Sequence, residues 1–250
     1  MMRWWGFLLL GILSYLTFLL ANLPASQGIS WLAANGVPLS TNDTRGTIWR
    51  GQAAKASYNN INLGATKWRF RPLGLFQGSI QYDVILTDPG QNLSGSTSYN
   101  FISGEYELDE INGRIEADII PKLINQTYVR TTGKLDINLQ QASFTGRQPT
   151  SATGDFRWID AGIKSPVKAQ LGDLQFLVSS SETGLQIDVK DLDGQLKLDG
   201  RIDLAADGKY KIKGKVKPNN SANSGLGGLL GSLGRRQADG STLIDYSGQL

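Results

Sequence analysis

The sequence lacks histidine and cysteine entirely, since neither residue occurs among its 250 positions. Without histidine there is no Ser-His-Asp or Cys-His catalytic arrangement and no imidazole metal ligand. Without cysteine there is no thiol catalysis, no thiolate-bound zinc or iron–sulfur cluster, and no disulfide. Paired carboxylates are the acid–base chemistry that remains, as in glycosidases. We therefore expect no enzyme activity and no catalytic, cofactor-binding or metal-binding residue.

A large excess of one charge is also missing. The chain carries 25 Lys and Arg against 22 Asp and Glu, a net charge of +3. Nucleic-acid binding requires basic residues concentrated on one surface, so no nucleic-acid partner is expected. Hydrophobic residues make up 40% of the chain, which is too apolar for a disordered protein. The 30 glycines suit a β-protein with many tight turns.

A long uncharged run does occur, from Trp4 to Ala21, and it is apolar on every face. Extended to Leu23, the run comprises 20 residues. At about 1.5 Å per residue, a helix of that length spans roughly 30 Å, which is the thickness of the hydrocarbon core of a bilayer. Residues 1–25 are therefore predicted to form a transmembrane anchor.

The basic residues around this run predict its orientation. Arg3 and the amino terminus carry positive charge, and no further Lys or Arg follows until Arg45. The positive-inside rule then keeps the amino terminus in the cytoplasm and sends residues 24–250 across the membrane. A cysteine-free exported domain favours a bacterial envelope. We expect a single-pass inner-membrane protein whose C-terminal domain lies in the periplasm.

A cleaved signal peptide is the alternative interpretation of the same run. The apolar region of a signal peptide would span only about 7–15 residues, and this run is longer. Cleavage after Ala25 would also place Leu23 at the −3 position, where a small residue is preferred. The uncleaved anchor is therefore favoured.

Residues 26–44 are expected to form a short helical and linker segment. Ile29, Leu32 and Val37 follow a roughly helical spacing. Gly36 and Pro38 then stop the helix.

From residue 45 to residue 250 the apolar residues recur with a period of two. One face of each strand is then apolar and the other polar, which is typical of antiparallel sheets with one solvated side. No long linker divides this part, so the fold is predicted to be mainly β, with one elongated antiparallel domain built from meanders and one or two short helices. Clear alternation occurs at residues 68–70, 80–86, 111–119, 135–139 and 174–178.

Strand register can be tested by arithmetic in the stretch 185–217. A three-residue loop at 206–208, with Gly208 in the left-handed position, sets Leu204 against Tyr210 and Ile202 against Ile212. The same register sets Leu198 against Val216, and on the other face Asp203 against Lys211 and Asp199 against Lys215. A four-residue loop at 191–194 sets Val189 against Leu196, Ile187 against Leu198, and Asp188 against Lys197. A slip of one residue would place Leu against Lys throughout.

The C-terminal end has two further elements. Leu226, Leu229, Leu230 and Leu233 have helical spacing, which predicts a short amphipathic helix covering the end of the sheet. Alternation over residues 242–248 predicts a closing strand.

Several local motifs imitate binding or catalytic sites. Residues 225–231 (GLGGLLG) lack the sixth-position glycine of a dinucleotide loop and the Gly-Lys-Ser/Thr of a P-loop. Residues 191–194 (DLDG) resemble the start of a calcium loop but lack its later ligands, so a tight turn is expected. The pairs Glu105 with Glu107 and Asp199 with Asp203 each share a strand face, which a solvated surface explains without catalysis.

Two sets of side chains leave a functional alternative open. Five lysines alternate along 209–217, which is typical of edge protection on an exposed strand. The alternative is a ridge that contacts anionic lipid headgroups. Trp49, Trp68 and Trp158 are in phase with their strands and are expected to pack in the core, with a stacking platform as the alternative.

The order of motifs resembles the type II secretion system protein N family, also called general secretion pathway protein N. The resemblance covers nearly the whole chain, from the apolar anchor onward. The motifs are Leu23-Pro24-Ala25, residues 46–53 (GTIWRGQA), 68–72 (WRFRP), 75–78 (LFQG), 154–161 (GDFRWIDA), 207–210 (DGKY), 229–234 and 245–248 (DYSG).

This resemblance implies an accessory component of the machinery that exports folded proteins across the outer membrane. Such a protein is anchored in the inner membrane, has a periplasmic domain, and carries no known catalysis. Its expected partners are other secretion-system subunits, with no small-molecule substrate. It would act through strand edges or loops.

A second hypothesis is a lipid-handling envelope protein similar to the AsmA-like proteins, with lipid as its partner. Strands with one apolar face, and glycine kinks at Gly113, Gly200 and Gly214, could curl into an apolar groove. An open apolar trough would support this hypothesis, and a filled sandwich would contradict it. A carboxylate hydrolase is the third hypothesis, and it needs two carboxylates about 5–10 Å apart in one cleft.

Overall fold

The computed structural model of the chain describes residues 2–59, 61–123, 126, 128–146, 148–166, 168–193, 196–219, 230–231 and 234–249. It opens with two helices, α1 (Met2–Ala21) and α2 (Ala25–Ala34), and continues as one antiparallel sheet of 14 strands. The strands are β1 (Leu39–Gly46), β2 (Arg50–Tyr58), β3 (Ile61–Arg71), β4 (Ser79–Asp88), β5 (Gln91–Asn100), β6 (Glu105–Glu116), β7 (Arg130–Thr145), β8 (Gln148–Ser165), β9 (Ala169–Ser181), β10 (Gly184–Asp193), β11 (Leu196–Ala205), β12 (Lys209–Pro218), β13 (Arg235–Arg236) and β14 (Thr242–Gln249). Short helical turns occur at η1 (Pro72–Gln77), η2 (Ala117–Ile119) and α3 (Ile120–Leu123).

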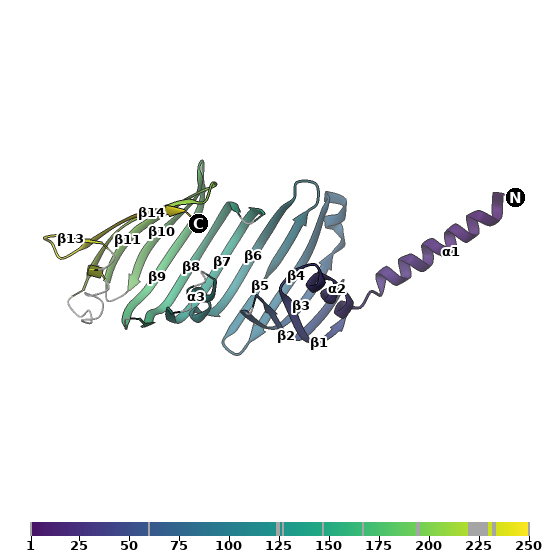
Figure 1. Ribbon diagram of the computed structural model, residues 1–250, viewed down its shortest axis with the longest axis horizontal. Coiled ribbons are helices and arrows are strands. Elements are labelled where there is room, and N and C mark those ends of the chain that lie inside the picture. The colour runs from purple at the N-terminus through teal and green to yellow at the C-terminus, as the bar shows by residue number, and fades with distance from the viewer. Residues whose placement is uncertain are drawn as a thin grey trace.

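The sheet is a continuous meander. Each strand pairs with its successor from β1 to β12, and β14 then pairs with β12 on one side and with β13 on the other. Figure 1 shows β1 beside the two N-terminal helices and β13 at the opposite end of an elongated body. The predicted mainly-β fold with an N-terminal apolar helix is confirmed. The first strand begins at Leu39, inside the segment 26–44 that was expected to be helix and linker.

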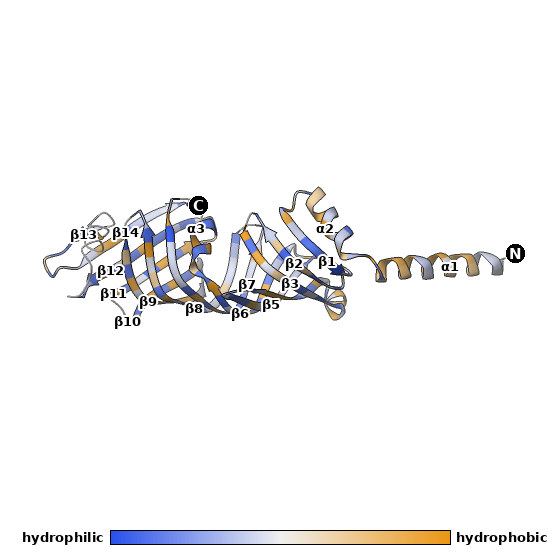
Figure 2. Ribbon diagram, turned by 90° about the horizontal axis from the view of Figure 1, so that it is seen from below, coloured by the Kyte–Doolittle hydropathy of each residue, from blue (hydrophilic) through white to orange (hydrophobic). Residues whose placement is uncertain are grey.

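One face of the sheet is apolar over most of its length, because apolar residues lie opposite each other from strand to strand. Phe156 on β8, for example, lies between Ile137 on β7 and Phe176 on β9. Figure 2 shows that the strands form a single curved layer. The only helical elements beside this layer in the described chain are α2, η1, η2, α3 and the one turn at residues 230–231.

The core is correspondingly thin. The only side chain described as fully buried and larger than alanine is Ser241, and Leu174, Leu196 and Val216 remain 3–4% exposed. The total accessible surface is 16394 Å². A compact monomer of 27.2 kDa would expose about 10,900 Å². The projecting helix α1 accounts for part of this excess, and the single-layer sheet accounts for the rest.

The register predicted between β11 and β12 is confirmed. Leu204 lies opposite Tyr210 and Ile202 opposite Ile212, as expected from the three-residue loop. Asp203 faces Lys211 and Asp199 faces Lys215. The closing strand predicted at residues 242–248 is present as β14.

The register predicted between β10 and β11 is wrong by four residues. Val189 lies opposite Gly200, and Asp188 lies opposite Arg201. The connection is longer than a tight turn, because β10 continues to Asp193 along β9, with a bulge between Asp191 and Asp193. The Asp191 carboxylate accepts a hydrogen bond from the Leu198 backbone N–H at 2.7 Å, which fixes this wider connection.

The helix predicted around residues 226–233 falls mostly outside the described residues. Leu230 and Gly231 are described, in a helical turn. The Leu230 side chain is buried and packs in a cluster with Leu174, Leu196 and Val216.

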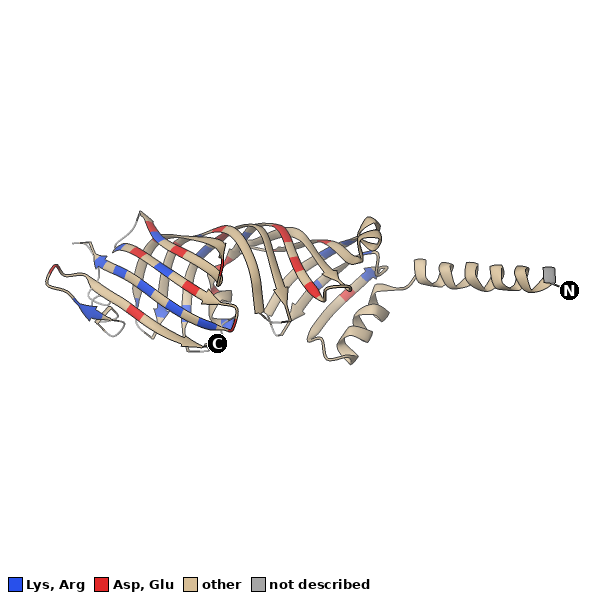
Figure 3. Cartoon of the chain, turned by 90° about the horizontal axis from the view of Figure 1, so that it is seen from above, with Lys and Arg blue, Asp and Glu red and all other residues tan. Residues whose placement is uncertain are grey.

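The five lysines of β12 do not lie on an edge strand, so the edge-protection interpretation is wrong. β12 is paired along its length with both β11 and β14. Figure 3 shows the lysines as alternating blue bands on a strand near the C-terminal end of the sheet. β14, which comes later in the chain, covers what would otherwise be the open edge of this strand.

Candidate functional site

The first turn of the sheet is joined directly to the end of α1. The Trp49 indole Nε1–H donates to the Leu20 carbonyl at 2.7 Å, and the Ile48 backbone N–H donates to the Leu23 carbonyl at 3.0 Å. The Trp49 ring packs edge-on against Phe70, with 4.8 Å between ring centroids. The β1–β2 turn and the end of β3 therefore lie next to the point where α1 ends.

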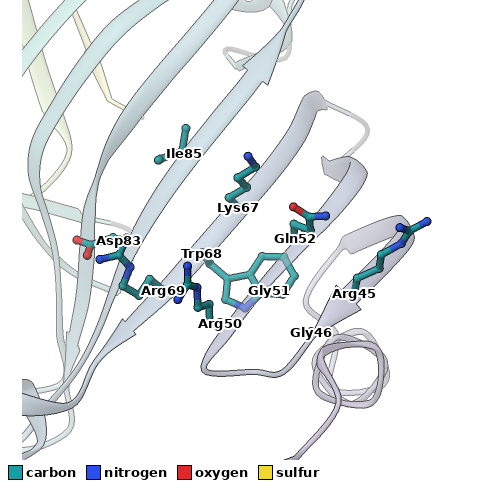
Figure 4. Close-up of a pocket in the computed structure, with 10 residues that line it drawn as sticks. All are labelled: Arg45, Gly46, Arg50, Gly51, Gln52, Lys67, Trp68, Arg69, Asp83 and Ile85. Atoms are coloured by element: carbon teal, nitrogen blue, oxygen red, sulfur yellow. The ribbon is translucent and has the colours of Figure 1, made fainter.

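A pocket of about 500 Å³ opens on the polar face of β1–β4 beside this junction. Its walls carry four cationic side chains from three strands and one carboxylate from a fourth (Figure 4). These are Arg45 on β1, Arg50 on β2, Lys67 and Arg69 on β3, and Asp83 on β4, with Gln52 and Ile85 completing the same face.

Strand pairing brings like charges together in this pocket. Arg50 and Arg69 lie directly opposite each other on β2 and β3. Like charges in that position destabilise a sheet unless something neutralises them. The carboxylate that lines the pocket, Asp83, lies opposite Arg69 but forms its ion pair with Arg71, at 2.7 Å.

The remaining cations have little to compensate them. Arg45 pairs with Asp43 at 3.2 Å, an exposed contact. Within the described part of the chain, Arg50, Lys67 and Arg69 have no ion pair and no side-chain hydrogen bond. Three uncompensated cations on one concave surface can bind an anion, and guanidinium groups suit the oxygens of a phosphate or carboxylate.

Close packing fixes the floor of the pocket. The Trp68 ring lies against Gly51, where an added Cβ would stand 2.8 Å from Trp68 Cε2 and 2.8 Å from the Arg45 carbonyl oxygen. The Trp68 indole N–H donates to the Thr47 carbonyl at 3.2 Å. Glycine at position 51 is therefore required for the ring to reach this position.

The sequence motifs that imitate catalytic sites are placed as follows. Glu107 accepts a hydrogen bond from the Ser98 hydroxyl at 3.2 Å, on a solvated strand face. Asp199 and Asp203 face Lys215 and Lys211 across the ladder. No cluster of three or more acidic side chains in the described ranges could hold a metal ion.

One carboxyl on the polar face is perturbed by its surroundings. Burial raises the pKa of Asp109, and the neighbouring Glu107 and Glu110 raise it further. Asp109 lines a second, polar pocket of about 430 Å³ together with Arg71 and Gln141. The charges in that pocket are mixed, which makes it a weaker candidate for ligand binding than the cationic one.

The three tryptophans identified from the sequence pack against the structure. Each is half-buried, and each indole N–H donates to a backbone carbonyl, including that of Trp158 to Thr132 at 2.8 Å. This arrangement fits packing residues rather than a platform for ligand stacking.

The cationic pocket was not predicted from the sequence. One indication was available, because Lys67, Arg69 and Arg71 alternate and so share one strand face. The decisive fact is that Arg50 lies opposite Arg69, and this requires the β2–β3 pairing, which contains two irregularities.

Comparisons with known proteins agree on one family. A model of the type II secretion system protein N family matches residues 38–245. The chain is 28% identical to a type II secretion system protein N of Klebsiella pneumoniae, over 94% of this chain and 91% of the relative. It is 25% identical to that of Vibrio cholerae, over 94% of each chain, and 22% identical to that of Aeromonas hydrophila, over 96% of each. No solved structure matches the chain.

Proposed function

Because the chain belongs to the type II secretion system protein N family, we propose that it is a non-enzymatic component of the secretion apparatus. It is held in the inner membrane by α1, its sheet lies in the periplasm, and it acts by binding other subunits. The observation that carries this proposal is the single open sheet, which has an exposed edge for contact.

The anchor is supported by the character of α1. The segment Trp4–Ala21 is long and apolar enough to cross a membrane, and none of it is buried against the rest of the chain. A soluble domain would cover such a helix, whereas a lipid bilayer covers it without other protein. The absence of Lys and Arg between Arg3 and Arg45 supports the periplasmic orientation of the sheet.

Contact with other subunits is supported by the C-terminal edge of the sheet. β14 pairs with β12 along its length, but on its other side β13 reaches only Thr242 and Leu243. Within the described ranges, residues 244–249 have no strand partner on that side. An extended segment of another protein can add to such an edge through main-chain hydrogen bonds. Tyr246, which is 59% exposed, lies on this edge.

Photocrosslinking in living cells tests this function. A photoreactive phenylalanine analogue at Tyr246 should crosslink the full chain to another secretion subunit. The same analogue at Tyr128, which is also well exposed but lies in the β6–β7 connection, is the matched control. Normal export by a strain lacking the gene, with no subunit captured from Tyr246, would contradict the proposal.

A second candidate function, lipid handling, is favoured by one observation. The apolar face of the sheet has no second layer of strands over it in the described chain, and Ile80 and Tyr106 on that face are 40% and 49% exposed. Lipid extracted with the purified full chain in stoichiometric amounts, and lost after Ile137→Asp, would support this function. Equal lipid content in the variant would count against it.

A further inference from the structure

Five large apolar side chains are exposed to solvent on two neighbouring turns of the sheet. Leu73, Leu75 and Phe76 on η1 are 74%, 50% and 89% exposed, and Phe101 and Ile102 in the β5–β6 turn are 54% and 79% exposed. Together they present on the order of 600 Å² of apolar surface, at the size of such side chains. A patch of this size is at the upper limit for a monomer and is often functional.

The two turns form one surface. The Phe101 backbone N–H donates to the Gly78 carbonyl at 3.0 Å. The Ile102 side chain covers Gly78, where an added Cβ would lie 2.9 Å from Ile102 Cγ1. We call this surface the apolar rim, and it consists of Leu73, Leu75, Phe76, Phe101 and Ile102.

Hydrogen bonds hold the apolar rim in its exposed position. Gly78 closes η1 with φ of 73°, and the buried Ser79 hydroxyl donates to the Gly74 carbonyl at 3.1 Å. In the second turn the Asn100 side-chain oxygen accepts from the backbone N–H groups of Ile102 and Ser103, at 2.9 and 3.1 Å. The apolar side chains are therefore presented by braced turns.

The meander places the apolar rim at the same end of the strands as the terminus of α1. The β1–β2 turn contacts Leu20 through Trp49, and the Phe70 backbone N–H donates to the Trp49 carbonyl at 2.7 Å just before η1 begins. Successive turns at one end of a meander are two strands apart, or about 10 Å. Figure 1 shows the turns of this end along the upper rim of the sheet, on the side toward which α1 projects.

The cationic pocket opens at this same end. Arg50 follows Trp49 directly, and Arg69 directly precedes Phe70. Apolar side chains flanked by uncompensated cations are the combination that binds the interface of an anionic membrane. The apolar groups enter the boundary between headgroups and acyl chains, and the cations bind phosphates.

We propose that the apolar rim inserts into the surface of the bilayer that α1 crosses, and that Arg50, Lys67 and Arg69 bind the phosphate groups of its anionic phospholipids. The membrane is the binding partner because the apolar rim and the cationic pocket lie at the same end of the strands as the end of α1. The domain would then lie against the membrane in a fixed orientation, with its β14 edge held away from it. This inference rests on the proposed membrane anchoring of α1.

Depth-dependent fluorescence quenching in nanodiscs tests the proposal, and the cysteine-free chain makes single labels possible. The full chain carries one fluorophore on Phe76→Cys, and nitroxide groups on the lipid acyl chains quench it. Tyr58→Cys, an exposed aromatic position at the opposite strand end, is the matched control. Leu13→Cys, within α1, reports the transmembrane span itself.

The label at position 76 should be quenched several-fold more strongly than the label at position 58. Replacing a third of the phosphatidylcholine with phosphatidylglycerol should increase the quenching of the label at position 76. The Arg50→Gln/Arg69→Gln variant should lose this increase and keep the far-ultraviolet circular dichroism of the parent.

Three outcomes would overturn the inference. Equal quenching at positions 76 and 58, with position 13 quenched, refutes the membrane contact and leaves the anchor intact. Unquenched position 13 refutes the anchor and the contact together. The headgroup site is refuted if phosphatidylglycerol still increases the quenching at position 76 in the Arg50→Gln/Arg69→Gln variant. It is also refuted if inorganic phosphate added to the solution does not reduce that increase in the parent chain.

Discussion

Gly113 occupies a position in β6 that no other residue can take without moving a neighbouring strand. It lies between Leu93 on β5 and Ile137 on β7, with φ of 151°. An added Cβ would overlap the Asn92 carbonyl oxygen and stand 2.8 Å from Leu93 Cα. Both are backbone atoms, so no change of rotamer relieves the overlap. Only separation of β5 from β6 can do so.

The expected cost of Gly113→Ala has two parts. The positive φ costs an alanine about 1–2 kcal/mol. The steric overlap in a packed layer costs about 1–3 kcal/mol more. We therefore expect the variant to lower the free energy of unfolding by about 2–5 kcal/mol.

Gly104→Ala is the matched control for this experiment. Gly104 also has a positive φ, of 76°, but no atom would lie within 4 Å of an added Cβ. This control carries only the conformational cost of about 1–2 kcal/mol. Urea denaturation of the full chain in detergent, followed by far-ultraviolet circular dichroism, measures both variants. Equal loss of stability in the two variants would refute the argument that backbone contact between β5 and β6 requires glycine.

Three further predictions concern the stability of the sheet. Asp109→Asn should raise the urea midpoint at pH 7, because burial raises the pKa of this carboxyl and so destabilises its ionised form. The gain should shrink as the pH falls through the raised pKa of the native carboxyl and should be lost below the usual value of 3.8, and a constant gain would contradict the cause. Arg201→Gln should destabilise the protein at neutral pH, because Arg201 lowers the pKa of Asp188 through a hydrogen bond of 2.8 Å. That difference should fade as acid protonates Asp188, and an acid-independent difference would exclude this origin. Trp158→Phe removes the hydrogen bond to the Thr132 carbonyl and should cost about 1–2 kcal/mol, measured by the urea midpoint against a Phe156→Leu control.

Local alternation and loop chemistry were enough to predict a large part of the fold. The apolar helix, the short helix before Gly36 and the β11–β12 hairpin follow from sequence because each depends on residues close together in the chain. The tight turn at residues 206–208 leaves one register that pairs Leu with apolar residues and Asp with Lys.

The β10–β11 pairing shows where this reasoning fails. A slip of four residues keeps every side chain on its own face, so alternation cannot distinguish the two registers. Both registers also place a cation opposite the Asp188 carboxylate, Lys197 in the predicted register and Arg201 in the observed one. The length of the connection decides between them, and the bulge near Asp191 that sets this length is a tertiary feature.

Because alternation does not show which residues face each other across strands, the lysine row of β12 is visible in the sequence and the cationic pocket is not. On β12, Lys209 and Lys215 form ion pairs with Asp207 and Asp239. Lys211 lies opposite Asp203 on β11, and Lys213 lies opposite Asp245 on β14. On β3 the corresponding carboxylate is already paired, and Arg50 and Arg69 remain opposed. An alternating row of basic residues therefore does not identify an anion site. The charges on the two strands beside it do, and in this sheet they leave the uncompensated cations next to the end of α1.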